Sequence, residues 1–343
     1  MKRTISRRMS DLAQSEIRAM TQACIQMKGL NMAQGVCDTP VPPVVLEGAE
    51  KAIRDGYNVY TRFDGLPELR EAIAQKLLHY NGIEADKETE VTVSAGATGA
   101  FHCACAALLN PGDEVILFEP YYQYHISALV AVEAVPVVVH MEPPTWTYSM
   151  AQLEEVVTEK TKAIIVNSPG NPSGKVFTRP ELEALAGYSK TFSVTGWRIG
   201  YSVAAKPWAS AIGAMNDLLY VCAPGPLQIG VARGIGQLPD SFYANLAQDY
   251  QKKRDRFCRA LAAAGLTPSI PQGAYYVLAD VSRLPGDSGK ARAMYLLERT
   301  GVASVPGEAF FSGQKGARFI RFSYAKTESD LDEACHRLTT AKL

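Results

Sequence analysis

The sequence lacks an excess of charge of either sign. Its 343 residues include 35 lysines and arginines and 35 aspartates and glutamates, so the formal net charge is zero. Such a chain has no general field that attracts nucleic acid or an anionic membrane surface, and we expect neither as a partner. A local anion site remains compatible with a neutral total.

Long apolar runs are also missing. No window approaches the roughly 20 apolar residues of a membrane span. The first eight residues are basic, but polar and acidic residues follow at positions 11 to 16 without an apolar stretch, so we do not expect a secretory signal. Acidic residues in this region also disfavour a transit peptide, and the sequence therefore predicts a cytoplasmic protein.

Cysteine and histidine are too few and too scattered to predict a metal site or disulfides. The seven cysteines are an odd number without regular spacing, which indicates free thiols in a reducing compartment. Cys103 and Cys105 lie on an alanine-rich apolar segment, which favours buried thiols over metal ligands. The five histidines are dispersed, and we find no internal repeat or low-complexity segment.

Short β-branched apolar runs alternate with stretches of helical spacing in the first half of the chain. This alternation is typical of an α/β protein with a mostly parallel sheet between two layers of helices. The runs are residues 90–94, 114–118, 135–139 and 163–167, and the clearest helices are residues 44–55, 66–80 and 98–109.

The last hundred residues have a different, α+β pattern. Long helices are expected at residues 241–264, 290–300 and from 328, with strands at 275–280 and 318–323. Because 343 residues are too many for one simple core, we predict a large and a small domain. The predicted boundaries are an N-terminal arm with part of the small domain at 1–43, the large domain at 44–240 and the small C-terminal domain at 241–343.

One segment, residues 188–200 (YSKTFSVTGWRIG), combines a lysine, hydroxyl side chains and an arginine. Lys190 is compatible with an ordinary surface charge. A lysine that forms a Schiff base must instead lie in a pocket where its amine can lose a proton. Ser189 and Arg198 are suitable groups for a dianionic phosphate. From these residues alone both interpretations stay open.

Three further segments follow predicted strands. Residues 94–99 (SAGATG) join a strand to a helix, so backbone N–H groups and a hydroxyl can hold a phosphate there, although a plain turn uses the same small residues. Two prolines in residues 167–174 (NSPGNPSG) direct Asn171, and aromatic side chains crowd residues 118–124. We expect all three at the carboxyl ends of parallel strands, where open α/β sheets bind ligands.

Seven segments in this order closely resemble the class I/II, fold-type I aminotransferases that use pyridoxal 5'-phosphate, in the aspartate, aromatic and kynurenine branch. The resemblance covers nearly the whole chain. It implies that an amino group moves from an amino acid to a 2-oxo acid, with 2-oxoglutarate as the expected acceptor. The segments are residues 33–40 (AQGVCDTP), 60–70 (YTRFDGLPELR), 94–99, 171–174, 189–190, 196–200 and 319–323.

The resemblance also implies which residues bind the cofactor. Lys190 would form the Schiff base and then move the proton between substrate and cofactor. Asn171 would hydrogen-bond the ring hydroxyl. Tyr122 would stack on the ring, although Tyr121 or Tyr124 could take that role. The phosphate would be held by Ala97, Thr98, Ser189 and Arg198.

Three more residues would bind the substrate or serve a partner subunit. Arg321 would pair with the substrate carboxylate, a geometry that suits a guanidinium. An arginine in an alternating strand is also compatible with a surface ion pair, but we favour the carboxylate role. Gly35 would offer its backbone to the same carboxylate. Tyr60 would reach the phosphate of the neighbouring subunit, which implies a homodimer with shared sites. Trp197 is interpreted as a packing residue.

The resemblance breaks after residue 186. The family continues with about one helix and two strands, roughly forty residues by ordinary element lengths, before its Ser-Lys segment. The missing stretch carries the aspartate that pairs with the pyridine nitrogen and a tyrosine that holds the ring oxygen. Here Gly187 is followed directly by Tyr188.

Two interpretations of this break stay open. Either the chain truly lacks the segment and is a degenerate, non-catalytic relative, or the segment belongs to the natural chain and is missing from the sequence. We favour the second, because losing two buried strands would exceed the roughly 5–15 kcal/mol that keeps a domain folded. It predicts that Gly187 and Tyr188 are far apart with further chain between them. Other chemistry of the same fold, such as a β-lyase reaction, would use the same Lys190.

Overall fold

A computed structural model of the chain describes residues 6, 15–178, 197–341 and 343, which form two compact units. Each unit is assembled from stretches that are distant in the sequence. The first unit contains the described residues of 15–39, 111–178 and 247–343, and the second contains those of 40–110 and 197–246. The predicted domain boundaries at 43/44 and 240/241 stay a prediction.

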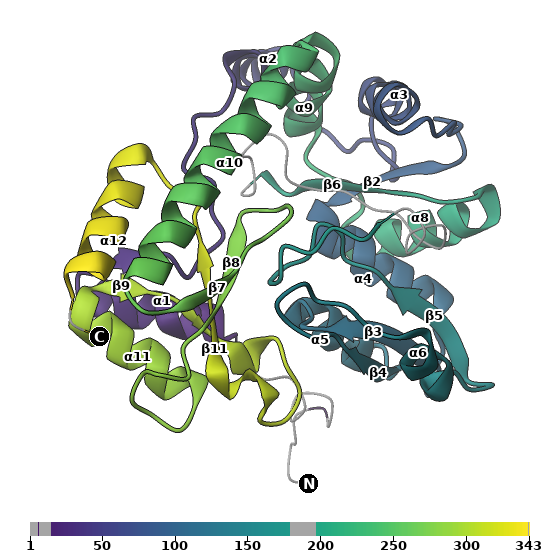
Figure 1. Cartoon of the computed structure of the whole chain (residues 1–343). Helices are drawn as coiled ribbons and strands as arrows, with labels where there is room; N and C mark the ends of the chain where they lie inside the picture. Colours follow the sequence, from purple (N-terminus) through teal and green to yellow (C-terminus); the bar gives the residue numbers. More distant parts are fainter. Residues whose placement is uncertain (1–5, 7–14, 179–196, 342) are drawn as a thin grey trace, which may run out of the picture. The chain divides into compact units, whose positions relative to one another are not determined.

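The first unit contains a parallel sheet of three strands. β3 (Glu114–Glu119) lies between β4 (Val135–His140) and β5 (Thr161–Ile165) and runs parallel to both. Helices α5 (Gln123–Ala131) and α6 (Met150–Val156) pack against β4, as Figure 1 shows. These strands confirm three of the runs predicted from β-branched residues, and the fold class is the predicted α/β class.

A second sheet in the first unit is antiparallel and has the order β10-β11-β8-β7. Its central strands are β8 (Tyr276–Asp280) and β11 (Phe319–Ser323), both predicted from the sequence. Every residue of β11 is buried, so the strand is enclosed on both faces. The outer strands are β10 (Val305–Pro306) and β7 (Thr267–Ser269).

Helices surround this antiparallel sheet and close one continuous apolar core. Val277, Leu278, Ile320 and Phe322 are each 0% exposed at its centre. A short parallel pair is formed by β1 (Leu30–Asn31) and β9 (Val302–Ala303). The helices are α1 (Glu16–Gln26), α11 (Gly289–Thr300), α12 (Glu328–Thr340) and the part of α10 (Asp240–Ala263) from residue 247 onward.

The second unit is mainly helical around one strand pair. β2 (Val91–Ala95) pairs antiparallel with β6 (Ile199–Val203), a strand that the sequence analysis did not predict. The expectation that β2 belongs to the parallel sheet is therefore wrong for the described residues. An apolar run indicates that a strand is buried but does not fix the direction of its neighbours. The helices are α2 (Pro43–Arg54), α3 (Pro67–Lys76), α4 (Gly96–Leu108), α8 (Lys206–Tyr220) and α9 (Gly225–Gln237).

Local signals in the second unit agree with the sequence. Pro67 occupies the first turn of α3, and Gly82, at a φ of 64°, ends the helical stretch after an unpredicted π-helical turn at Leu77–Asn81. Cys103 and Cys105 are buried thiols on α4, as predicted. Trp197 packs against α9 beside Gly230, which confirms its interpretation as a packing residue.

The buried centre of β11 gives a stability prediction. We expect Ile320→Ala to lower the free energy of unfolding by about 2–5 kcal/mol, because the residue is 0% exposed and its loss leaves a cavity. Urea denaturation followed by circular dichroism measures the change. Ile270→Ala, at a position 57% exposed, is the matched control and should change stability by less than about 0.5 kcal/mol. Equal effects of the two variants would contradict the assignment of this core.

Candidate active site

A buried guanidinium is the main feature of the candidate site in the first unit. Arg321 on β11 is 1% exposed, and its guanidinium lies 4.4 Å from the ring centre of Tyr276 and 5.0 Å from that of Phe310. It donates a hydrogen bond of 3.0 Å to the side-chain oxygen of Asn171 and another to the carbonyl of Ala33. The interpretation of Arg321 as a surface ion pair is therefore wrong.

The charge of Arg321 is not balanced within the described residues. None of their carboxylates forms an ion pair with it, and its Nε atom is buried without a hydrogen-bond partner. Burial lowers the pKa of the Arg321 guanidinium from its ordinary value, and the electrostatic contributions of Tyr276, Tyr122 and Tyr275 oppose this change. A buried charge is costly unless it is paired, so this geometry favours an anionic ligand.

Gly35 lies against the same aromatic ring. A side chain at this position would overlap the hydroxyl group of Tyr276, so only glycine allows the tyrosine to approach the backbone this closely. Because Tyr276 in turn covers Arg321, the structure brings the three predicted substrate-binding residues, Gly35, Asn171 and Arg321, into one place.

The loop that carries Asn171 is held by its own backbone. The Asn167 side chain donates to the carbonyl of Asn171 at 3.2 Å, and the N–H group of Gly170 donates to the carbonyl of Lys175 at 2.8 Å. Gly174 has a φ of 68° and packs against Pro271, which leaves no room for a side chain. Asn171 is consequently 9% exposed and fixed toward Arg321.

A small cavity of about 20 Å³, room for about one water molecule, lies at the carboxyl ends of β3 and β5. Tyr121 and Tyr122 both line it, whereas Tyr124 does not. Tyr121 also donates its N–H group to the carbonyl of Phe310 at 2.9 Å, which ties this segment to the surroundings of Arg321. His125, also at the cavity, is neutral at pH 7 because burial lowers its pKa to about 4.

Three of the residues predicted to hold the phosphate, Ala97, Thr98 and Arg198, lie near the start of α4 in the second unit. Gly96 begins α4 at a φ of 73°, and a side chain there would overlap the guanidinium of Arg198. A side chain at Gly200 would likewise overlap the N–H group of Ala97. Thr98 is exposed in the first turn of the same helix. A guanidinium beside a helix N-terminus is a suitable environment for a dianion, so these residues fit the phosphate of the expected cofactor.

Two predicted cofactor residues, Ser189 and Lys190, lie outside the described residues. The junction between Gly187 and Tyr188 lies there as well, so the predicted distance across it stays a prediction. The aspartate that pairs with the pyridine nitrogen in the family belongs to the missing stretch, and no acidic residue near a motif obviously replaces it.

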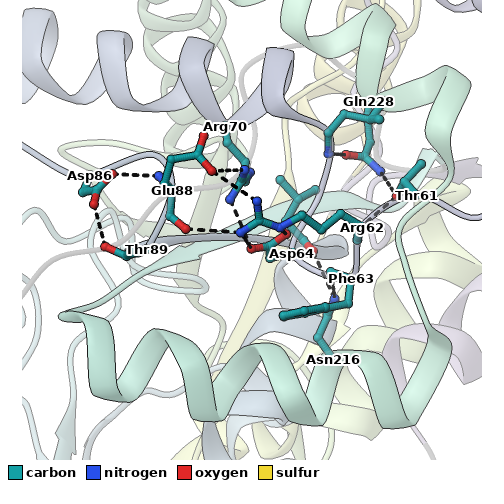
Figure 2. A network of polar contacts seen from close by, with 12 residues as sticks. Thr61, Arg62, Phe63, Asp64, Arg70, Asp86, Glu88, Thr89, Asn216 and Gln228 are labelled. Atoms are coloured by element: carbon teal, nitrogen blue, oxygen red, sulfur yellow. Dashed lines mark hydrogen bonds and ion pairs between the residues drawn. The ribbon is translucent and has the colours of Figure 1, made fainter.

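Tyr60 is 82% exposed and directly precedes a segment that is held by ion pairs, in which Arg70 and Asp64 are buried and Arg62 and Glu88 are about half exposed. Figure 2 shows the network. Asp64 accepts from Arg62 at 2.8 Å and from Arg70 at 3.1 Å, and both guanidinium groups also contact Glu88 at 3.1 Å. Arg70 is 0% exposed and Asp64 is 7% exposed. We refer to Arg62, Asp64, Arg70 and Glu88 as the ionic cluster.

Tyr276 and Phe310 were not predicted as site residues from the sequence. The signal for Tyr276 was present, because alternation along residues 275–280 places Tyr276 and Leu278 on one face. In the antiparallel register Leu278 lies opposite Arg321, so Tyr276 is its diagonal neighbour. Phe310 follows a short 3₁₀ turn that no periodic pattern announces.

The ionic cluster gives a prediction for acid stability. The pKa of Glu88 lies below its ordinary value of 4.5. The causes are a hydrogen bond from Arg70, the positive charge of Arg70 and a hydrogen bond from Arg62. The stabilisation is therefore complete above pH 4.5 and is lost as the pH falls through the lower, folded-state pKa. We expect Glu88→Gln to flatten the decrease of the melting temperature below pH 4.5, measured by circular dichroism. Glu84→Gln, at an exposed position outside the cluster, should keep the wild-type profile, and a profile of Glu88→Gln equal to that of the wild type would refute the prediction.

Known proteins resemble the chain over nearly its full length. The family model "Aminotransferase class I and II" matches residues 27–187 and 184–338. A probable aspartate/prephenate aminotransferase of Aquifex aeolicus is 30% identical, with 99% of both chains covered. A kynurenine–oxoglutarate transaminase of Dictyostelium discoideum is 28% identical over 93% of this chain and 92% of the relative. The solved structure of a methionine aminotransferase of Escherichia coli has a TM-score of 0.92 and 26% identity, and 98% of this chain and 99% of that chain are covered.

The comparisons also contain a break. The family model matches in two pieces that meet at residues 184–187. The alignment with the Aquifex aeolicus relative has 397 positions, 54 more than the 343 residues of this chain, so the relative has residues without a counterpart here. The break coincides with the segment that the sequence analysis found missing. With that one interruption, the chain belongs to the class I and II aminotransferases, pyridoxal-phosphate-dependent enzymes of the transaminase class.

Proposed function

We propose that the protein moves an amino group from an amino acid to 2-oxoglutarate at sites shared by two copies of the chain. The observation that carries this proposal is the buried, unbalanced guanidinium of Arg321. Both the amino-acid donor and the oxo-acid acceptor have a carboxylate next to the reacting carbon. One cation can therefore orient both substrates in turn.

Arg321 would bind that carboxylate through two parallel hydrogen bonds, for which a planar guanidinium is suited. Tyr276 and Phe310 would keep water from the guanidinium and fix its plane. Gly35, close to the Tyr276 hydroxyl, would offer its backbone to the same carboxylate. The existing bond from Arg321 to Asn171 would link substrate orientation to the cofactor ring.

Pyridoxal 5'-phosphate, when bound, supplies a ring that accepts the electrons of the substrate carbanion. The amine of Lys190 would carry the cofactor and afterwards move a proton at the substrate carbon. Asn171 would donate to or accept from the ring hydroxyl, and Tyr122 would cover the ring face. The phosphate would be held by Ala97, Thr98, Ser189 and Arg198, and across the subunit boundary by Tyr60.

The homodimer is part of the proposal. The exposed ring of Tyr60 supports it, because an aromatic side chain 82% exposed on a fixed backbone is available to another copy. A cytoplasmic location is proposed on the sequence alone. None of the helices in the described ranges has the length and apolar character needed to cross a bilayer.

Two alternatives differ from transamination, and an observation favours one of them. The interrupted family match supports a degenerate relative that keeps the shape without the chemistry, since no acidic residue obviously replaces the missing aspartate. A β-lyase reaction would use the same lysine. Formation of glutamate from 2-oxoglutarate, compared with release of ammonia or a thiol, separates transamination from lyase chemistry, and the absence of all three products identifies the degenerate relative.

The lysine assignment predicts a single covalent label. After incubation with pyridoxal phosphate and reduction with borohydride, peptide mapping should find the cofactor on Lys190, and Lys190→Ala should abolish the label. Lys206→Ala, at an exposed position, is the control and should leave the label in place. Lys175 is the informative rival, because it is 5% exposed and lies in the loop of Asn171. A label on Lys175 would end the assignment.

The carboxylate assignment predicts a selective loss of substrate affinity. Arg321→Lys should weaken amino-acid binding by about 1.5–3 kcal/mol, roughly ten- to a hundredfold in dissociation constant, because the paired hydrogen bonds are lost. The affinity for pyridoxal phosphate should change little. Arg318→Lys is the matched control, since Arg318 is 58% exposed and pairs with Asp280 at the surface. Unchanged amino-acid affinity in Arg321→Lys would count decisively against the role.

A further inference from the structure

The segment that follows Tyr60 is fixed along its whole length by buried side chains. The Gln228 side chain accepts from the N–H group of Leu66 at 2.8 Å and donates to the Thr61 hydroxyl at 3.4 Å. Asn216 donates to the carbonyl of Phe63 at 2.5 Å, and both Asn216 and Gln228 are 0% exposed. The backbone of residues 61–66 therefore has little freedom, as the crowded contacts in Figure 2 illustrate.

The ionic cluster also holds the segment of residues 61–66. Asp64 forms ion pairs with two guanidinium groups, that of Arg62 from its own segment at 2.7 Å and that of Arg70 from α3 at 3.1 Å. The carbonyl of Asp64 also accepts from the N–H group of Val93 on β2 at 2.9 Å. Two arginines that share one carboxylate hold the segment in a single orientation between a helix and a strand.

The two residues that precede this segment are apolar or aromatic and exposed to solvent. Val59 is 79% exposed and Tyr60 is 82% exposed. The N–H group of Thr61 donates to the sulfur of Cys222, directly after α8 and Val221. Near the end of α8, Leu218 is 77% exposed. The exposed side chains of Val59 and Tyr60 thus directly precede a segment whose backbone is held by hydrogen bonds and ion pairs.

We infer that the ionic cluster positions Tyr60 for the cofactor phosphate in a second copy of the chain. The inference rests on the proposed dimer. Buried ion pairs contribute little to stability compared with well-packed apolar residues, and orientation is the better explanation for burying Arg70 completely. Because Arg62 and Asp64 lie two and four residues after Tyr60, the ion pairs that fix them also fix the backbone from which the Tyr60 side chain extends. They are positioning residues and do not touch the phosphate themselves.

The first experiment compares the dissociation constant of pyridoxal phosphate among full-length variants by fluorescence titration. Tyr60→Phe and Asp64→Asn should each raise this dissociation constant roughly tenfold, the effect expected for one charge-assisted hydrogen bond. The double variant should bind pyridoxal phosphate as tightly as Tyr60→Phe alone. Glu71 lies on the same helix as Arg70 and forms an exposed ion pair with Lys87. Glu71→Gln breaks that pair and should leave the dissociation constant unchanged. Arg62→Gln replaces Asp64→Asn if the latter does not fold. An unchanged constant in Asp64→Asn or Arg62→Gln, or additive effects in the double variant, would overturn the inference.

The second experiment uses hybrid dimers in which only one subunit keeps Lys190, with dimer formation checked by sedimentation. Asp64→Asn should weaken cofactor binding when it lies in the subunit that lacks Lys190, and it should have no effect in the subunit that keeps it. An effect confined to the subunit that keeps Lys190 would overturn the inference. Tyr60→Phe in the same two arrangements tests the shared site itself. If Tyr60→Phe acts across subunits and Asp64→Asn does not, only the positioning role fails, whereas no effect of Tyr60→Phe across subunits refutes the proposed dimer site.

Discussion

The buried charge of Arg321 is the constraint on which the candidate site depends. A guanidinium that is 1% exposed loses its hydration, and the described part of the chain offers aromatic faces, one amide oxygen and one carbonyl instead of a carboxylate. Each of these partners requires a further feature. The face of Tyr276 depends on the register of β8 against β11, and its hydroxyl requires glycine at position 35. The sheet and two loops are therefore arranged around one cation.

Much of this arrangement could be predicted from the sequence because it follows from local rules. A short β-branched run predicted β3, and the strand patterns near the C-terminus predicted β8 and β11. Pro67 and Gly82 lie at the two ends of the helical stretch around α3 and agree with its limits. The partners of a strand depend on contacts that are distant in the sequence, so the antiparallel pairing of β2 with β6 was not predicted. The arginine of β11 was predicted from the family resemblance, whereas its aromatic neighbours required the cross-strand register.

The residues of the candidate site were named from the resemblance, whereas the ionic cluster was found only in the structure. Gly35, Asn171 and Arg321 lie close together in the structure, Arg198 lies beside Gly96 at the N-terminus of α4, and the roles that the resemblance gives these residues stay predictions. The ionic cluster was not predicted. Its members are charged residues 2 to 26 positions apart, and such spacing usually indicates a solvated surface. Only the three-dimensional path of the chain shows that Arg70 is enclosed.

The interruption of the family match has a physical counterpart in the strands on either side of it. Among the described residues, β5 pairs only with β3 and β6 pairs only with β2, so each strand has one edge without a strand partner. β3, which has two neighbours, is almost completely buried, whereas the apolar residues Ile164 and Ile165 of β5 are only partly buried. Apolar strand edges that remain open promote association between chains. A segment of two strands inserted in the chain between β5 and β6 would supply partners for such edges, and in the resemblance the same segment carries the aspartate for the pyridine nitrogen. The pairing of these strand edges and the electronics of the cofactor would then depend on one stretch of chain, so a protein that lacks it would be expected to lose solubility and catalysis together.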